Sequence, residues 1–263
     1  MATDWLAGKN IVIIGGTSGL GLSAALACRE AGANVVVNGR KPQVAETAGE
    51  TLGSQVPVVV GDAMEEDTAE SAIACCIEKF GSLHGLYHVA GGSGRSFGDG
   101  PLHDITLDGW EYTLRLNLTS MMLSNRAAVR HFLKQPSGGV ILNMGSVLGY
   151  SPSPVYFATH AYAAAKSAII GYSKSIAAYY APQNIRVNVI VPALVETPMS
   201  VRAVRDPLIH AFAKTKQPLD GGRVGVPEDL DGATVFLLSD QAKFITGQVL
   251  AIDGGWDISE GQL

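Results

Sequence analysis

The stretch Asn10-Ile-Val-Ile-Ile-Gly15-Gly16-Thr17-Ser18-Gly19-Leu20-Gly21 decides the fold, because it joins a short apolar, β-branched run to a helical pattern through a loop of glycines. The helical pattern runs to Ala31 and is closed by Gly32. A glycine loop between a strand and a helix lets the backbone approach a phosphate closely. We therefore expect dinucleotide binding here, and the alternative is a tight turn without a ligand. The expected binding residues are Gly15, Thr17, Ser18, Gly19, Leu20 and Gly21.

Strand and helix patterns alternate along the rest of the chain. Apolar runs predict further strands at 34–38, 56–60, 85–90, 139–144, 185–191 and 248–252, and helical patterns lie near 42–53, 65–80, 108–135, 160–180 and 227–239. Strands that are apolar on both faces and separated by helices indicate a parallel sheet covered on both sides. The sequence therefore predicts an α/β fold of the Rossmann type, with a doubly wound, mainly parallel seven-stranded sheet in three α/β/α layers.

Length and composition favour one domain over residues 1–263. A hydrophobic fraction of 47% is ample for a large core, and no linker or repeat marks a boundary. The least regular region, about 193–226, contains three prolines and the pair Gly221-Gly222. We expect this segment to form a substrate lid, and the alternative is an ordinary irregular connection.

Charge and cysteine content exclude several classes of protein. The net charge of −5 gives no general attraction to nucleic acid or to an anionic membrane. Neither a signal peptide nor a run of roughly eighteen apolar residues is present in the sequence. Cys28, Cys75 and Cys76 lack metal-ligand spacing and are expected to be reduced. We therefore expect a cytoplasmic protein without a metal, a nucleic acid partner or a membrane partner.

The end of the second predicted strand distinguishes the two nicotinamide dinucleotides. An NAD site usually places a carboxylate there, on the 2′-hydroxyl of the ribose, but this sequence has Asn38-Gly39-Arg40-Lys41. A guanidinium pairs well with a phosphate, so we expect Asn38 and Arg40 to favour NADP(H) over NAD(H); the alternative is an exposed basic turn. Asp62, followed by Ala63, either accepts a hydrogen bond from adenine or caps the helix near 65.

Tyr162 and Lys166 are four residues apart on a predicted helix and share one face of it. A unit charge about 4 Å away, at an effective dielectric of about 20, would lower the pKa of a phenol by about three units. We expect Lys166 to lower the pKa of Tyr162 toward neutrality, although an isolated pair of this kind usually only packs. Ser146 follows the strand ending at Met144 and could hold a substrate oxygen. Asn117 is polar within an apolar stretch and could relay protons through water to Lys166.

Together these features resemble the short-chain dehydrogenase/reductase family, in its one-domain Y-x-x-x-K branch, from about Leu6 to Ile258. The resemblance also rests on Ala90-Gly91, on Pro192-x-x-Val195-x-Thr197 and on the tail 244–255. It implies hydride transfer between a nicotinamide and a carbonyl or alcohol, with the proton passing through Tyr162. Lys166 would also hold the nicotinamide ribose, Ser146 would orient the substrate oxygen, Asn117 would support the water relay, and Val195 and Thr197 would face the carboxamide. It also implies a homotetramer or dimer formed through the helices near 108–135 and 160–180.

Departures from the family pattern leave other functions open. Ile14 replaces the usual threonine, His88-Val89 replaces a pair of asparagines, and Ala193 replaces the glycine after Pro192. We therefore expect the support of the cofactor pocket to differ, and the long loop at 147–160 to shape the substrate pocket. One alternative is a catalytically silent nucleotide sensor or scaffold. Another is an enoyl reductase, but similar folds with that activity usually space tyrosine and lysine more widely, and no tyrosine stands seven residues before Lys166.

Overall fold

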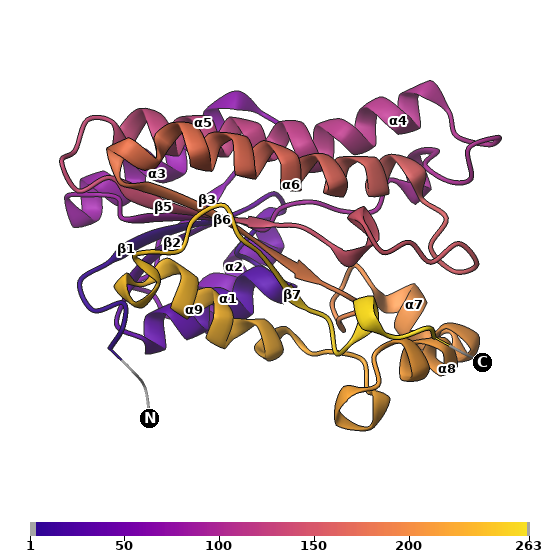
Figure 1. Cartoon of the computed structure of the whole chain (residues 1–263). Helices are drawn as coiled ribbons and strands as arrows, with labels where there is room; N and C mark the ends of the chain where they lie inside the picture. The colour runs from indigo at the N-terminus through magenta and orange to yellow at the C-terminus, as the bar shows by residue number, and fades with distance from the viewer. Residues whose placement is uncertain (1–3, 262–263) are drawn as a thin grey trace.

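In the computed structural model, which describes residues 4–261, seven short strands form one sheet (Figure 1). Neighbouring strands all run parallel, in the order β3-β2-β1-β4-β5-β6-β7. The strands are β1 (Asn10–Ile14), β2 (Asn34–Gly39), β3 (Val58–Val60), β4 (Gly85–His88), β5 (Gly139–Met144), β6 (Ile185–Pro192) and β7 (Val249–Ile252). The predicted parallel, doubly wound sheet is confirmed.

Helices cover both faces of the sheet (Figure 1). One layer holds α3 and α5 with α4 and α6, and the other holds α1, α2 and α9. These helices are α1 (Gly19–Glu30), α2 (Pro42–Leu52), α3 (Glu66–Phe80), α4 (Leu107–Leu114), α5 (Ser120–Phe132), α6 (His160–Tyr180) and α9 (Asp231–Leu238). The three-layer arrangement follows from the strands, which need apolar cover on both sides.

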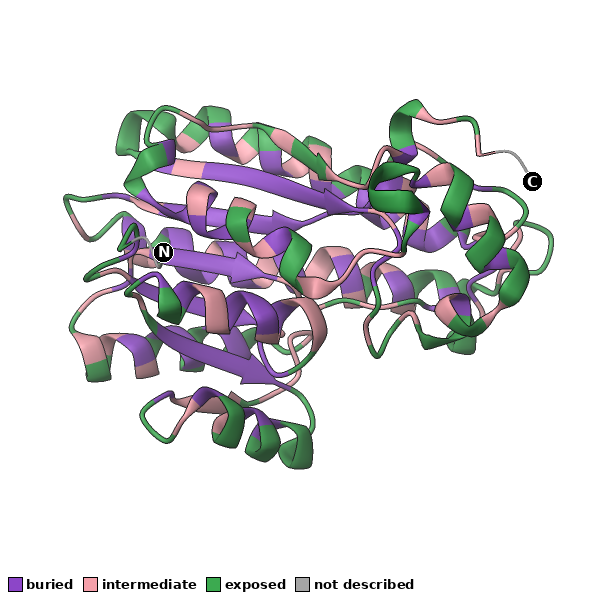
Figure 2. Ribbon diagram, turned by 90° about the horizontal axis from the view of Figure 1, so that it is seen from below, coloured by how far each residue is buried: buried purple, intermediate pink, exposed green. Residues whose placement is uncertain are grey.

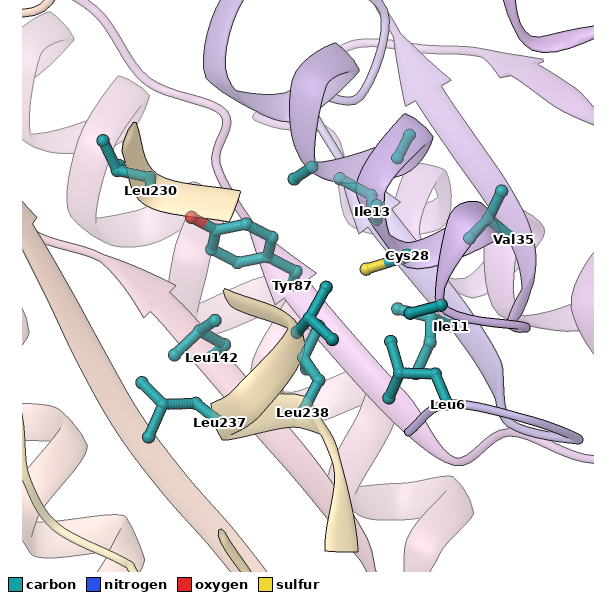
Figure 3. Packing of buried hydrophobic residues seen from close by; sticks show 14 of the residues in the cluster. Leu6, Ile11, Ile13, Cys28, Val35, Tyr87, Leu142, Leu230, Leu237 and Leu238 are labelled. Atoms are coloured by element: carbon teal, nitrogen blue, oxygen red, sulfur yellow. The ribbon is translucent and has the colours of Figure 1, made fainter. Parts of the chain in front are cut away.

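Alternate residues of each strand belong to different layers. Ile11 and Ile13 pack with α1 and α9, whereas Val12 and Ile14 pack with α3 and α5. Figure 3 shows the first of these two cores, where the ring of Tyr87 from β4 lies among leucines of the α9 region and Cys28 of α1. Burial on both sides explains why the strands read as continuous apolar runs rather than alternating ones.

Several boundaries differ from the prediction, and three of the differences have a local reason. β3 begins at Val58, because Pro57 has no N–H to donate to a sheet. The long helix predicted near 108–135 is interrupted by a π-helical turn at Arg115–Thr119, where the Asn117 side chain donates to the Thr113 carbonyl. The last predicted helix begins with a 3-10 turn at Pro227–Leu230 before α9.

The strand order reverses between β1 and β4, which creates a crevice beyond their carboxyl ends. The segment 193–226 folds on that same side of the sheet, toward which the strands point in Figure 2. It is more regular than predicted, because it contains α7 (Val201–Arg205) and α8 (Pro207–Lys216). Within residues 4–261, no helix combines the length and the apolar character needed to cross a bilayer.

Candidate active site

The glycine loop passes over the carboxyl end of β1 so closely that side chains do not fit. A Cβ atom at Gly15 would lie 2.6 Å from the Ala90 backbone nitrogen, and one at Gly21 would lie 2.1 Å from the Gly15 carbonyl oxygen. Ser18 stands at the N-cap of α1, but its hydroxyl makes no capping hydrogen bond there. The first N–H groups of α1 and this hydroxyl therefore face the crevice without a helix partner, which suits a phosphate.

Backbone hydrogen bonds hold this loop where the family pattern has a threonine hydroxyl. Ile14 is fully buried, and its carbonyl accepts hydrogen bonds from the N–H groups of Val89 and Ala90, at 2.8 and 2.9 Å. On the other side, the N–H groups of Gly15 and Gly16 donate to the Asn38 carbonyl, at 3.1 and 2.9 Å. The loop is thus attached to both neighbouring strands, and the departure at Ile14 leaves the phosphate cradle intact.

His88, the other main departure, links β4 to α5. Its Nδ1 lies 2.8 Å from the hydroxyl oxygen of Ser124, and its Nε2 lies 3.4 Å from that of Ser120. Burial, reinforced by the charge of Lys166, lowers the pKa of His88 to about 3. The ring is therefore neutral at physiological pH and serves as a buried structural contact beneath the site.

The adenosine end of the crevice differs in part from the prediction. Arg40 is exposed after β2, with its guanidinium 3.6 Å from the Asp62 carboxylate. Asp62 also accepts a hydrogen bond from the Met64 N–H at 3.0 Å, so it shapes the turn after β3, and Glu65 is the residue at the N-cap of α3. Asn38 was predicted to bind the cofactor beside Arg40, but its side chain is not available for this role, because it is buried and donates to the carbonyls of Val59 and Gly61.

Thr17 and Ala63, which were also predicted to bind the cofactor, have side chains that pack against other parts of the protein. Thr17 packs against the end of β2, where a Cβ atom at Gly39 would lie 2.1 Å from the Thr17 hydroxyl. Ala63 packs against the core beneath α3. Both lie at the same carboxyl edge of the sheet as the glycine loop, so they shape the crevice chiefly through their backbone.

Ser146, Tyr162 and Lys166 meet at one cavity of about 340 Å³ beyond the carboxyl end of β5. Tyr162 lies in the first turn of α6 and is 9% exposed, and Ser146 is 6% exposed. The Ser146 hydroxyl accepts a hydrogen bond from the Leu148 N–H at 3.2 Å, which fixes it at the start of a 3-10 turn. The structure therefore brings the three residues together as the sequence predicts, although they come from two elements.

The predicted lowering of the Tyr162 pKa by Lys166 is not found. Burial raises the pKa of Tyr162 to about 12, and a hydrogen bond with Ser146 acts in the opposite direction. The Lys166 ammonium donates to the Met144 carbonyl at 2.9 Å and lies 5.5 Å from the centroid of the Tyr162 ring. Burial also lowers the pKa of Lys166 to about 8. Loss of solvation thus outweighs the attraction between the two side chains.

Asn117 connects the loop after β4 to the π-helical turn. Its side chain donates to the carbonyls of Gly92 and Thr113, both at 2.9 Å, and accepts from the Gly92 N–H at 3.0 Å. A Cβ atom at Gly91 would lie 2.7 Å from the Asn117 oxygen and 3.7 Å from the Lys166 ammonium. Asn117 therefore holds this loop beside Lys166, and the proton relay through water stays a prediction.

Asp99 positions the catalytic helix, and the sequence reasoning missed it. One carboxylate oxygen accepts from the N–H of Ala161 and the other from the N–H of Tyr162, each at 3.0 Å. Thr159, at the N-cap of α6, makes no capping hydrogen bond with its side chain. A buried carboxylate at this helix end satisfies unpaired N–H groups and interacts favourably with the helix dipole. Its separation of 63 residues from Tyr162 leaves no pattern in the sequence.

Several further residues predicted to bind the cofactor border the same cavity, as does part of the predicted lid. Pro192, Val195, Thr197, Leu20 and Gly91 all line it. From the segment 193–226, lining residues include Leu194, Met199 and Arg202. Two more lining residues carried no signal in the sequence, namely Arg95 in the loop after β4 and Trp256 near the end of the described chain.

The long loop at 147–160 forms part of the cavity wall. Phe157 and Thr159 line it. Tyr156 packs against Phe212 of α8, with ring centroids 5.0 Å apart, and His160 is exposed at the start of α6. Neither Tyr156 nor His160 is among the residues that line the cavity.

The cysteines and acidic residues offer no other reactive centre. Cys28, Cys75 and Cys76 are unpaired, and burial raises the thiol pKa of both Cys28 and Cys76 to about 12. Among residues 4–261, no group of three His, Cys, Asp or Glu side chains is arranged to hold a metal ion. The chemistry of the described residues therefore centres on the Tyr162 cavity.

Comparisons with known proteins agree with this geometry. Residues 15–257 match a family model described as enoyl-(acyl carrier protein) reductase. 3β-Hydroxysteroid dehydrogenase 2 of Eggerthella lenta is 34% identical over 255 residues, which cover 95% of each chain. Glucose 1-dehydrogenase of Gluconobacter oxydans is 32% identical over 256 residues, or 96% of this chain and 93% of that protein.

Solved structures extend the likeness to the fold. A short-chain type dehydrogenase/reductase from Mycobacterium ulcerans superimposes with a TM-score of 0.87 at 28% identity, covering 97% of this chain and 92% of that one. The 3-ketoacyl-(acyl-carrier-protein) reductase from Brucella melitensis, solved in complex with NADH, gives a TM-score of 0.84 at 28% identity, covering 96% of this chain and 100% of that one. The chain therefore belongs to the short-chain dehydrogenase/reductase family.

Proposed function

We propose that the chain is an NADP(H)-dependent oxidoreductase that transfers a hydride between nicotinamide and a carbonyl or secondary alcohol, with Tyr162 as the general acid and base. The observation that carries the proposal is the meeting of Tyr162, Ser146 and Lys166 at one cavity, beside the crevice where the glycine loop lies. The bound cofactor supplies the hydride chemistry, and the protein supplies position and electrostatics.

Three residues of the chain have separate roles in the proposed reaction. Ser146 donates a hydrogen bond to the substrate oxygen and orients it. Tyr162 gives its proton to that oxygen during reduction and takes it back during oxidation. The Lys166 ammonium stabilises the phenolate that remains, because its charge lies 5.5 Å from the centroid of the Tyr162 ring and both side chains are buried. The apolar lining keeps water away from the reacting carbon.

The preference for NADP(H) rests on Arg40. Its guanidinium stands exposed at the end of β2, where a carboxylate would instead favour the free 2′-hydroxyl of NAD. Asp62 competes for this guanidinium at 3.6 Å, so part of the gain from a phosphate contact is offset. The Brucella neighbour was solved with NADH, so the family likeness alone does not indicate NADP(H). The proposed preference for NADP(H) therefore depends on Arg40 of this chain.

Several features of the whole chain belong to the same proposal. We infer that it works as one domain, with the segment 193–226 as a lid, because this segment lines one side of the cavity. The exposed side chains of Trp110 on α4 and Tyr179 on α6 support assembly of a dimer or tetramer through these helices. Sedimentation of a monomer at micromolar concentration would refute that assembly. The three unpaired cysteines agree with a cytoplasmic location.

Reduction of a carbon-carbon double bond is disfavoured, despite the description of the matching family model. The position seven residues before Lys166 holds Thr159, which lines the cavity but has no acidic phenol to supply. A silent sensor or scaffold is also disfavoured, since Ser146, Tyr162 and Lys166 keep a connected arrangement around an open cavity.

A substrate panel tests the proposal. Purified protein with NADPH is mixed with ketones and aldehydes of varied shape and, in parallel, with a 2-enoyl thioester, and cofactor absorbance is followed. We expect oxidation of NADPH with at least one carbonyl compound and none with the enoyl thioester. Turnover of the thioester alone would move the assignment to enoyl reduction, and NADPH binding without any turnover would favour the sensor.

A further inference from the structure

The ionisable side chains around the Tyr162 cavity all carry the same sign of charge. Lys166, Arg95 and Arg202 line it, and among the described residues no aspartate or glutamate does so. The chain as a whole has 24 acidic against 19 basic residues, so this local excess of cations runs against the average composition. Lys166 belongs to the catalytic set, which leaves the two arginines without a role in the proposed reaction.

The two arginines reach the cavity from distant parts of the sequence. Arg95 begins a 3-10 turn, Arg95–Phe97, in the loop after β4, and Arg202 lies on α7 in the segment 193–226. Partial burial lowers the pKa of Arg95, and the charge of Arg202 lowers it further, so the two guanidiniums lie within electrostatic reach of each other. Holding two guanidiniums near each other costs free energy unless something negative lies between them.

The charge of Asp99 offsets this repulsion only in part, since the pKa of Arg95 stays lowered. Among residues 4–261, no ion pair includes Arg95 or Arg202. Both carboxylate oxygens of Asp99 already accept hydrogen bonds from backbone N–H groups of α6. The guanidinium donors are thus available to a ligand inside the cavity.

The pyrophosphate of the cofactor is a possible rival for these donors. That group has its own place on the glycine loop and the start of α1, where N–H groups and the Ser18 hydroxyl are available. Arg95 lies instead in the loop after Gly91 and Gly92, which borders the cavity on the side of the substrate. A hydroxyl at Ser96, beside Arg95 on the same wall, adds a further polar group there.

We propose that Arg95 and Arg202 form an anion subsite of the Tyr162 cavity, so that the natural substrate is an oxo acid or hydroxy acid. The acid group, which is a carboxylate, sulfonate or phosphate, pairs with the two guanidiniums while the reacting oxygen lies against Tyr162 and Ser146. This inference rests on the proposed carbonyl reduction. In that reaction the ketone carbon gains a hydride from NADPH, the oxygen gains the Tyr162 proton, and the products are the hydroxy acid and NADP⁺.

The test compares the reduction by NADPH of oxo acids of increasing chain length with that of their neutral methyl esters. The measured quantity is the ratio of kcat/KM for each acid to kcat/KM for its ester. Wild type should favour the acid by about tenfold or more, as expected for charge-assisted hydrogen bonds. Arg95→Gln and Arg202→Gln should each reduce this ratio by about tenfold, and KM for NADPH should not change. Arg205→Gln is the matched control, because Arg205 lies on the same helix α7 but does not line the cavity. Oxo sulfonates and oxo phosphonates of the same lengths identify the preferred acid group.

The outcomes that would contradict the anion subsite can be told apart from those that would contradict the proposed reduction. A wild-type ratio near one, or equal losses on acid and ester in the variants, would overturn the anion subsite while leaving the reductase in place. A raised KM for NADPH in Arg202→Gln with an unchanged ratio would assign that arginine to the cofactor and also overturn it. If no carbonyl compound is reduced, calorimetry with the oxo acids still decides: binding to wild type that the Arg95→Gln/Arg202→Gln double variant loses supports the subsite, and absence of binding overturns it.

Discussion

The carboxylate of Asp99 accepts a hydrogen bond from the backbone N–H of Tyr162 at 3.0 Å, so the loop after β4 directly fixes the residue that we propose as the proton donor. The other carboxylate oxygen accepts a hydrogen bond from the N–H of Ala161. The two hydrogen bonds together set the direction of the first turn of α6. Asp99 itself is 4% exposed and does not line the cavity, so we regard it as a positioning residue.

Asp99→Ala should therefore lower kcat by about tenfold to a hundredfold, since small displacements of a catalytic group are costly. Asp99→Asn, which keeps one accepting oxygen, should recover much of this loss. Steady-state kinetics combined with thermal unfolding checks the prediction. A loss of activity that only follows the fraction of unfolded protein, with kcat per folded molecule unchanged, would remove the positioning role.

Arg40→Ala should weaken NADPH binding by about tenfold or more and leave NADH binding nearly unchanged, because only NADPH carries the 2′-phosphate. Fluorescence titration of both cofactors measures this. Arg115→Ala is a suitable control, since Arg115 is also exposed and paired with a carboxylate, that of Glu65 at 3.0 Å. Equal weakening of both cofactors in Arg40→Ala would contradict the assignment.

The pH dependence of carbonyl reduction should report on Lys166. Its pKa is lowered to about 8, so the ammonium is present below that pH and is lost as the pH rises through it. Tyr162, with a pKa raised to about 12, stays protonated and able to donate throughout this range. We expect kcat to fall as the pH rises above about 8. A profile that stays flat well into the alkaline range would show that the charge of Lys166 does not assist the reaction.

A partly buried carboxyl outside the site should limit stability at higher pH. Burial raises the pKa of Asp231 from 3.8 to about 6, so the folded state holds this proton more tightly than the unfolded state does. Ionisation of this carboxyl therefore lowers the free energy of unfolding as the pH rises from 3.8 to about 6. Above about pH 6 the loss of stability is complete. Asp231→Asn keeps an oxygen for the Ser23 hydroxyl, which now donates to Asp231 at 2.7 Å. The variant should have a higher Tm than wild type at pH 8 and no such advantage at pH 4; a pH-independent difference in Tm would contradict this.

The sequence predicted those features that depend on local pattern. The strands, the helices and the glycine loop follow from periodicity and turn chemistry, and Tyr162 and Lys166 share a helix face because of their spacing. The glycine contacts at Gly15 and Gly21 confirm that the loop needs residues without side chains.

Features that depend on tertiary packing were not predictable in the same way. Burial, not the charge of Lys166, controls the pKa of Tyr162, and burial is known only once the cavity is formed. Asn38 was assigned to a phosphate from its place after a strand, yet its side chain faces the backbone of β3. Asp99 and Arg95 lie in the loop after β4 and Arg202 lies on the five-residue helix α7, and no periodic pattern specifies the paths of these segments.

The central claim is that Tyr162 moves the proton at a site that binds the cofactor independently of it. Tyr162→Phe removes only the hydroxyl, so fluorescence titration should show NADPH affinity within a few-fold of wild type. Single-turnover reduction of the best carbonyl substrate from the panel should then be slower by about a hundredfold or more. Turnover within about tenfold of the wild-type rate, with NADPH still bound, would contradict the account.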